Sequence, residues 1–188
     1  MDNVKKYNII YADPPWSYND KKCLGGAEKI YSCMSLQDIC NLSVPNIAAD
    51  NCILFLWATY PMIREALQVI DAWGFTYKTI GFNWIKLSKT GKKLSFGLGR
   101  YTRGNSEPLF IAVKGKIECI CHNMNEVLCV PNLRHSEKPD IFRRKIVELV
   151  GDLPRCELFA RTKTEGWDVW GNEVDCDFNL IINKEEGR

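Results

Sequence analysis

The residues best suited to chemistry are Asp13, Pro14, Pro15 and Trp16, which directly follow a short buried strand expected at residues 8–12. An aromatic amine such as the exocyclic nitrogen of adenine is a poor nucleophile, because its lone pair is delocalised into the ring. Two acceptors that bind its two hydrogens, the Asp13 carboxylate and the rigidly held Pro14 carbonyl, would localise that lone pair and orient it toward an electrophilic methyl group. Trp16 can stack on an extruded base. From local chemistry alone, a turn that merely ends a strand explains the motif at least as well.

A second candidate region is the segment from Lys86 to Arg103, which holds six basic residues and no acid. Glycines make it flexible, and Phe96 and Tyr101 interleave it with aromatic rings. Such a segment can neutralise phosphates and stack on bases, and a solvated loop with a chance excess of charge is the alternative. The basic residues are Lys86, Lys89, Lys92, Lys93, Arg100 and Arg103.

The nine cysteines do not indicate a disulfide framework, because their number is odd and several lie in apolar runs. Cys40, Cys52 and Cys129 are therefore expected to be buried, reduced thiols that pack as small hydrophobic side chains. The segment 119–122 (Cys-Ile-Cys-His) is the only metal-like group, and it lacks a second pair of ligands at zinc spacing. The sequence thus predicts no metal site.

The length and composition predict one compact domain over residues 1–188. The hydrophobic fraction of 46% can fill a sizeable core, and the net charge of +2 excludes no class of partner. No apolar stretch reaches the roughly 18 residues that a membrane helix needs, and no secretory signal is visible. A cytoplasmic protein without a membrane partner is therefore expected.

Strand-length apolar runs alternate with segments of helical periodicity, which predicts an α/β sheet with helices on both faces. Ligands of open α/β sheets bind beyond the carboxyl ends of the strands. Asp13, Trp57, Lys114 and Arg161 all follow such ends, so they are expected to gather at one site. The tail from Asp175 is polar and is expected to fray. Strands are expected at 8–12, 52–57, 75–87, 109–113, 157–160 and 167–170, and helices at 36–42, 61–73 and 139–150.

The segment Tyr11-Ala12-Asp13-Pro14-Pro15-Trp16 resembles the DPPW motif of the permuted adenine N(6)-methyltransferases. That family includes the catalytic subunit of the messenger-RNA N(6)-adenosine methyltransferase and phage and bacterial DNA adenine methyltransferases. The resemblance extends from about Ile9 to Val174 in the family's order. Its further segments are Tyr31–Ser35, Leu54–Thr59, Asn83–Lys86, Glu107 with Ile111–Gly115, Ser136–Asp140, Glu157–Arg161 and Trp167–Asn172.

The resemblance implies a Rossmann-like methyltransferase fold in permuted order, with the catalytic strand before the cofactor strand, and S-adenosyl-L-methionine as cofactor. It places Asp13 at the target amine near the methionine end of the cofactor, and Trp16 at the base. Core packing is the alternative role for Trp57 and Phe159. By the same mapping the target pocket is lined by Tyr31 and Trp57, and the cofactor is contacted by Lys114, Phe159, Arg161 and Asn172.

The sequence departs from the family where Ala160 replaces a frequent glycine and where Lys163 and Thr164 replace a His-Asn pair. The compact chain favours DNA over RNA as the nucleic-acid partner, with Lys86, Lys92, Lys93, Arg100 and Arg103 as contacts. Two other functions stay open: a catalytically silent nucleic-acid-binding subunit, and methylation of another planar amine such as cytosine or a glutamine amide. Whether the protein acts alone or as a homodimer or heterodimer is also open.

Overall fold

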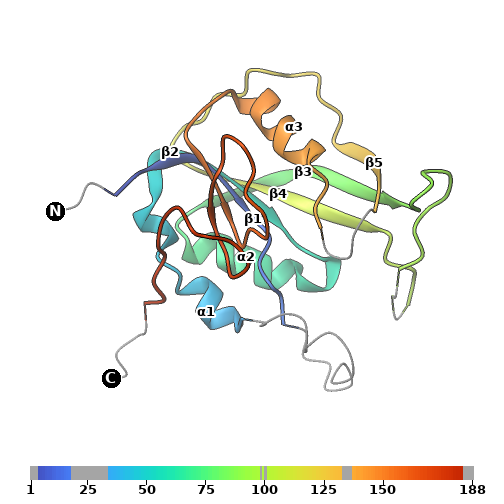
Figure 1. Cartoon of the computed structure of the whole chain (residues 1–188), viewed down its shortest axis with the longest axis horizontal. Coiled ribbons are helices and arrows are strands. Elements are labelled where there is room, and N and C mark those ends of the chain that lie inside the picture. The colour runs from blue at the N-terminus through green and yellow to red at the C-terminus, as the bar shows by residue number, and fades with distance from the viewer. Residues whose placement is uncertain (1–3, 18–33, 98, 100, 133–136, 184–188) are drawn as a thin grey trace.

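The computed structural model describes residues 4–17, 34–97, 99, 101–132 and 137–183. Within these residues seven strands form one sheet in the order β5-β3-β4-β2-β1-β6-β7 (Figure 1). β4 is antiparallel to its neighbours β2 and β3, and the other neighbouring pairs are parallel. The strands are β1 (Tyr7–Ala12), β2 (Ala48–Trp57), β3 (Thr76–Leu87), β4 (Ser106–Lys114), β5 (Val127–Pro131), β6 (Arg155–Leu158) and β7 (Asp168–Trp170).

Helices cover both faces of the sheet, as predicted. α1 (Leu36–Cys40) and α2 (Ile63–Ala72) lie on one face, and α3 (Ile141–Val150) lies on the other (Figure 1). Ser35 caps α1, because its Oγ accepts a hydrogen bond from the Asp38 N–H at 3.0 Å. Short 3₁₀ turns, η1 (Val44–Asn46) and η2 (Tyr60–Met62), precede β2 and α2, and each carries a proline in its first turn.

Residues 52–57 of β2 are continuously apolar because successive side chains enter two different cores. Cys52, Leu54 and Leu56 face α1 and α2, whereas Ile53, Phe55 and Trp57 face α3. All six are at most 2% exposed. A stretch of strand that is buried on both faces has no solvent-facing positions, so it shows no polar alternation.

The direction of β4 corrects one expectation from the sequence. Because β4 is antiparallel, its last residue, Lys114, pairs with Cys52 near the start of β2, at the edge opposite Asp13. Its second residue, Glu107, pairs with Trp84 and lies at the predicted ligand edge instead. The short edge strand β5 was not predicted, since its five residues end in a proline and lie within an otherwise polar stretch.

The expected fraying from Asp175 does not occur in the described part of the tail, which ends at residue 183. Asp177 accepts from the Val169 N–H at 2.9 Å and pairs with Lys163 at 2.7 Å. The Phe178 ring lies 5.3 Å from that of Tyr7, and Ile181 exchanges hydrogen bonds with Ser43. The tail therefore packs against the sheet and against the α1–η1 connection.

The cysteines follow the prediction only in part. Cys52 is buried and Cys40 is half-buried, but Cys129 is exposed because it lies on the edge strand β5. No disulfide joins cysteines of the described segments, and these segments hold no group of three or more His, Cys, Asp and Glu side chains placed for a metal. None of their helices is long and apolar enough to cross a membrane.

Phe142 anchors α3 to the sheet, with its ring 4.9 Å from Trp57 and 6.1 Å from both Phe82 and Trp84. We expect Phe142→Ala to lower the free energy of unfolding by about 3–5 kcal/mol, because it removes a fully buried ring and leaves a cavity. Urea unfolding would measure the loss. Phe96→Ala, at a position that is 73% exposed, is the control and should change stability by less than about 0.5 kcal/mol. Equal losses would contradict this packing.

Candidate active site

Asp13 lies directly after β1, where two prolines turn the chain out of the sheet. Both of its carboxylate oxygens accept hydrogen bonds from the Lys138 ammonium at 2.8 Å. Lys138 comes from the segment that leads into α3, with Pro139 behind it. The contact therefore joins the end of β1 to the start of α3, residues 125 positions apart in the chain.

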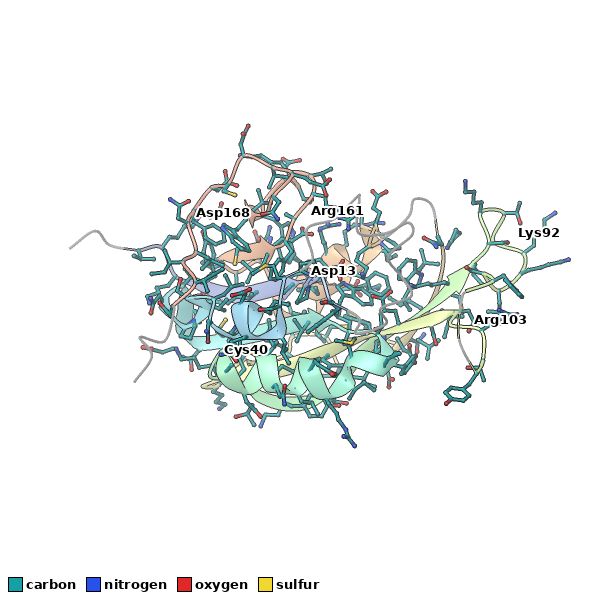
Figure 2. The ribbon with its side chains drawn as sticks, turned by 90° about the horizontal axis from the view of Figure 1, so that it is seen from below. Asp13, Cys40, Lys92, Arg103, Arg161 and Asp168 are labelled. Atoms are coloured by element: carbon teal, nitrogen blue, oxygen red, sulfur yellow. The ribbon has the colours of Figure 1, made fainter. Side chains whose placement is uncertain are left out.

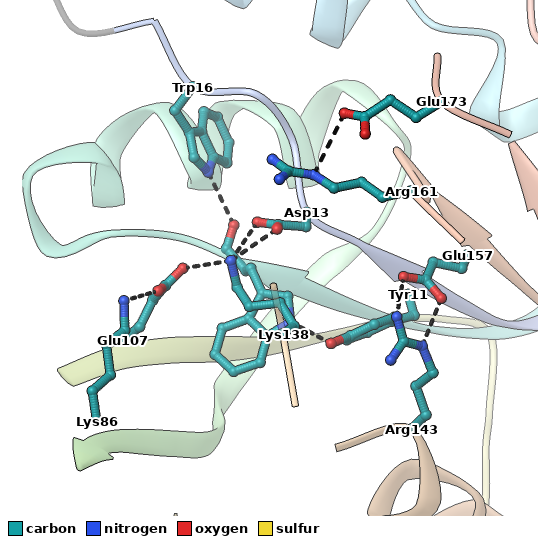
Figure 3. Close-up of polar contacts among 11 residues, drawn as sticks. Tyr11, Asp13, Trp16, Lys86, Glu107, Lys138, Arg143, Glu157, Arg161 and Glu173 are labelled. Atoms are coloured by element: carbon teal, nitrogen blue, oxygen red, sulfur yellow. Dashed lines mark hydrogen bonds and ion pairs between the residues drawn. The ribbon is translucent and has the colours of Figure 1, made fainter. Parts of the chain in front are cut away.

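The Lys138 ammonium is shared with a second carboxylate, Glu107 of β4, at 2.9 Å. Glu107 also pairs with Lys86 of β3 at 2.6 Å (Figure 3). The side chains of Lys138 and Glu107 are 9% and 7% exposed, whereas Asp13 retains 26%. The four side chains form an alternating row of charges, in which Asp13 is the anion that solvent and ligands can reach.

Burial and the neighbouring charges set the protonation of this row. Burial raises the pKa of Asp13 above its usual value, the Lys138 ammonium opposes that shift, and the nearby Glu107 adds to it. Burial alone would also raise the pKa of Glu107, but Lys138 and Lys86 outweigh it and hold that pKa below its usual value. Burial would lower the pKa of Lys138, and its two carboxylate partners raise it instead. Lys138 therefore stays charged, and Asp13 is the group in the row that acid protonates first.

The aromatic side chains of Trp57, Tyr11 and Trp16 pack next to this row of charges. The Trp57 ring is fully buried and lies 5.2 Å from the Lys138 ammonium, and its Nε1–H donates to the Tyr11 hydroxyl at 2.6 Å. The Trp57 carbonyl accepts from Trp16 Nε1–H at 3.1 Å. Trp57 therefore packs in the core beneath the site, which is the alternative role, and its buried ring does not line a pocket open to solvent.

A second buried ion pair lies beneath Tyr11. The guanidinium of Arg143, on α3, donates two hydrogen bonds of 2.7 Å to the carboxylate of Glu157, on β6. It also lies 5.5 Å from the centre of the Tyr11 ring. This bidentate pair fixes the helix against the strand next to β1. Tyr11 is thus held between Arg143 and Trp57, on the strand that carries Asp13.

The hydrogen bonds of the motif also constrain Pro14 and Trp16. The Pro14 carbonyl accepts from the Trp16 N–H at 2.8 Å, which uses one of its two lone pairs. The Trp16 indole is half-buried and packs against the α1–α2 core. The motif is therefore a defined turn whose carbonyl and carboxylate are both held in place.

The predicted cofactor residues Phe159 and Arg161 follow β6, which pairs with β1 so that Leu158 is opposite Ala12, the residue before Asp13. Phe159 follows with φ 63°, and it is the only non-glycine residue in the described ranges with a positive φ. Such strain at the end of a strand is typical of a functional turn. Arg161 lies near enough to Asp13 to act on its charge, and its Nε is 3.9 Å from Glu173 (Figure 3). Asn172, beside Glu173, is exposed.

Not every predicted site residue joins this group. Lys114 pairs with Cys52 at the opposite edge of the sheet and does not join the group around Asp13. Lys86 is not a free phosphate contact, since its side chain is 22% exposed and bound to Glu107. Tyr31 and Arg100 lie outside the described residues.

The other basic residues lie on an extension beyond the ends of β3 and β4, where Figure 2 shows Lys92 and Arg103. The Lys93 carbonyl accepts from the Ser88 N–H at 2.8 Å and the Lys86 carbonyl from the Ser95 N–H at 2.7 Å. These bonds close residues 86–96 into what we call the basic hairpin. Its lysines 89, 92 and 93 are exposed, as a surface that binds phosphates requires.

The family model of MT-A70 matches residues 7–173 of the chain. The chain belongs to the MT-A70 family. Membership of the adenine N(6)-methyltransferase family, predicted from the DPPW motif, is thereby confirmed. The match contains every residue of the charged row around Asp13.

Individual relatives of the MT-A70 chain differ in length. It is 35% identical to the type II methyltransferase M.MunI of Mycoplasma sp, over 90% of this chain and 78% of that protein. It is 29% identical to human N(6)-adenine-specific methyltransferase METTL4, over 90% of this chain and 38% of that protein. It is 24% identical to human METTL3, an N(6)-adenosine-methyltransferase catalytic subunit, over 90% of this chain and 28% of that protein.

Lys138 and Glu107 are the site residues that sequence reasoning missed. Both lie in segments that carry the family resemblance, a Lys-Pro pair before a helix and an acid at the start of a strand. The available signal was chemical: a glutamate at the start of an apolar strand is costly to bury unless a cation pairs with it. The antiparallel direction of β4, which brings this glutamate to Asp13, was not visible in the sequence.

We expect Lys138→Gln to move the acid limb of the pH profile of kcat/KM to higher pH by about one unit or more. Ionised Asp13 carries only acceptors, whereas protonation turns one of its oxygens into a donor and removes the charge. Activity therefore falls as the pH drops through the pKa of Asp13, and loss of the neighbouring cation raises that pKa further. Lys116→Gln is the control, because Lys116 is an exposed lysine that follows β4 at the edge of the sheet opposite Asp13. An acid limb that stays in place or moves to lower pH would show that Lys138 does not govern the charge of Asp13.

Proposed function

We propose that this MT-A70 protein transfers the methyl group of S-adenosyl-L-methionine to the N(6) amine of adenine in DNA. The observation that carries the proposal is the Asp13 carboxylate, which is held at the end of β1 by Lys138 and is partly open to solvent. A carboxylate fixed beside a rigid prolyl carbonyl offers two acceptors for an amine with two hydrogens. Family membership supplies the reaction class in which that arrangement is useful.

Asp13 would bind one hydrogen of the amine, and the free lone pair of the Pro14 carbonyl would bind the other. Lys138 already occupies both Asp13 oxygens at 2.8 Å, so it keeps the carboxylate ionised and oriented. Each carboxylate oxygen can accept a further hydrogen bond, and an incoming amine therefore need not displace the lysine. Positioning of the nucleophile in line with the methyl group is the main contribution that these residues make to the rate.

The charged side chains at Asp13 and around it fit the charges of S-adenosyl-L-methionine, which carries a sulfonium, an ammonium and a carboxylate. Asp13 supplies an anion for the cationic end, and Arg161 supplies a cation within the electrostatic range of Asp13. Phe159 and Asn172 follow the neighbouring ends of β6 and β7 and would contact the nucleoside part. When bound, the cofactor supplies a methyl group that its sulfonium has already activated.

The order of the strands agrees with a permuted methyltransferase. β1, which carries Asp13, precedes β6 and β7 in the chain but lies beside β6 in the sheet. We assign β1 as the catalytic strand and the ends of β6 and β7 as the cofactor side. Lys114 has no part in this assignment.

DNA is the proposed substrate because the chain is more similar to the type II methyltransferase M.MunI, at 35% identity over 78% of that protein, than to the N(6)-adenosine-methyltransferase subunit METTL3, at 24% identity. The basic hairpin supplies exposed cations for a phosphate backbone. A silent binding subunit would need neither the intact motif nor the charge row, so we favour a catalytically active chain.

Asp13→Asn tests the proposed role. It keeps the shape of the side chain but replaces one acceptor oxygen with a donor group and removes the charge, so we expect kcat to fall by roughly a hundredfold or more. Methyl transfer from labelled S-adenosyl-L-methionine to DNA would measure it, and isothermal titration would show whether the cofactor still binds. Asp50→Asn, at the other end of the sheet, is the matched control. More than about a tenth of wild-type turnover in Asp13→Asn would exclude the role.

A further inference from the structure

Lys86 connects the basic hairpin to the active site. Its ammonium pairs with Glu107, which shares Lys138 with Asp13. Its backbone carbonyl accepts from the Ser95 N–H at 2.7 Å, and its own N–H donates to the Asn105 carbonyl at 2.8 Å. These contacts fix the basic hairpin, and the segment that leads from it into β4, to β3 and β4, which carry Lys86 and Glu107.

Next to Ser95, the hairpin exposes an aromatic ring to water. The Phe96 side chain is 73% exposed, and the Arg103 guanidinium lies 4.2 Å from the centre of its ring. A guanidinium at this distance holds the ring by a cation–π contact, and its own charge remains available to a phosphate. Lysines 89, 92 and 93 of the same hairpin are also exposed, so the ring lies on a basic segment. An exposed, braced aromatic ring among cations is suited to nucleic acid.

We propose that Phe96, braced by Arg103, inserts into duplex DNA and fills the gap left when the target adenine leaves the helix. This proposal rests on the proposed function. An enzyme that acts on the N(6) amine must take the base out of its stack, and the vacated step loses its stacking on both sides. An apolar side chain wedged between base pairs restores part of that contact, while the surrounding cations neutralise the phosphates that the distortion brings close.

The proposed insertion of Phe96, which we call the wedge, predicts a loss of activity that depends on whether the target adenine is paired. Phe96→Ala should lower kcat/KM on duplex DNA by roughly tenfold or more, the effect of one lost stacking contact, and by less than about twofold on the same sequence as a single strand. Pairing the target adenine with an abasic site should restore much of the lost activity, because little extrusion cost remains. The duplex probe is a short oligonucleotide around one adenine that the wild-type protein methylates in plasmid DNA, located by sequencing.

A binding measurement separates extrusion from turnover. With 2-aminopurine in place of the target adenine, the wild-type protein should raise the fluorescence of the duplex as the base unstacks, and Phe96→Ala should not. Leu94→Ala is the matched control, since Leu94 is an apolar residue of the same hairpin that is 57% exposed. Arg103→Lys should give an intermediate loss on duplex DNA only, because a lysine keeps the charge but not the planar contact with the ring.

Several results would overturn the wedge. An equal loss on paired and single-stranded DNA would make Phe96 a general binding residue, and no loss at all would remove it from recognition. A change in oligomeric state in Phe96→Ala, measured by light scattering, would assign the ring to a contact with a second protein chain. If the wild-type protein methylates no DNA, the proposed function fails together with the wedge, whereas failure of the variants alone leaves the function intact.

Discussion

A single ammonium group, that of Lys138, is shared by two carboxylates in a site that is closed to solvent on most sides. A charge buried in this way is tolerated only when it is paired, and removal of one partner from a buried pair costs about 3–5 kcal/mol. Asp13 at the end of β1 and Glu107 at the start of β4 must therefore lie on either side of this lysine. Since Lys138 leads into α3, the same contact fixes that helix over the sheet.

The rest of the architecture supports this contact. Trp57 lies beneath the lysine and is itself held by Tyr11, and the Arg143–Glu157 pair ties α3 to the neighbouring strand β6. These contacts bring three strands and one helix to the edge where the chain of β1 leaves the sheet. A carboxylate positioned by so many constraints loses little further freedom when it binds a ligand, which is what catalysis by positioning requires.

Local patterns predicted the elements well, because each depends on nearby residues. The buried β2, the Ser35 cap and the helix before Gly151 follow from apolar runs, capping chemistry and periodicity. The direction of β4 depends on long-range pairing, and for that reason Lys114 was placed at the wrong edge and Glu107 was overlooked. The motif at Asp13 was predicted from its chemistry and the family resemblance, but its partner lysine is 125 positions away and only the fold brings the two together.

The measurement that most directly tests the account is identification of the methylated nucleoside. The protein would be incubated with S-adenosyl-L-methionine that carries an isotopically heavy methyl group, in the presence of matched DNA and RNA, and the nucleosides would be analysed by mass spectrometry. We predict the heavy methyl group on N(6) of deoxyadenosine. Its appearance on cytosine would contradict the assigned amine, and a preference for adenosine in the RNA would contradict the assigned substrate.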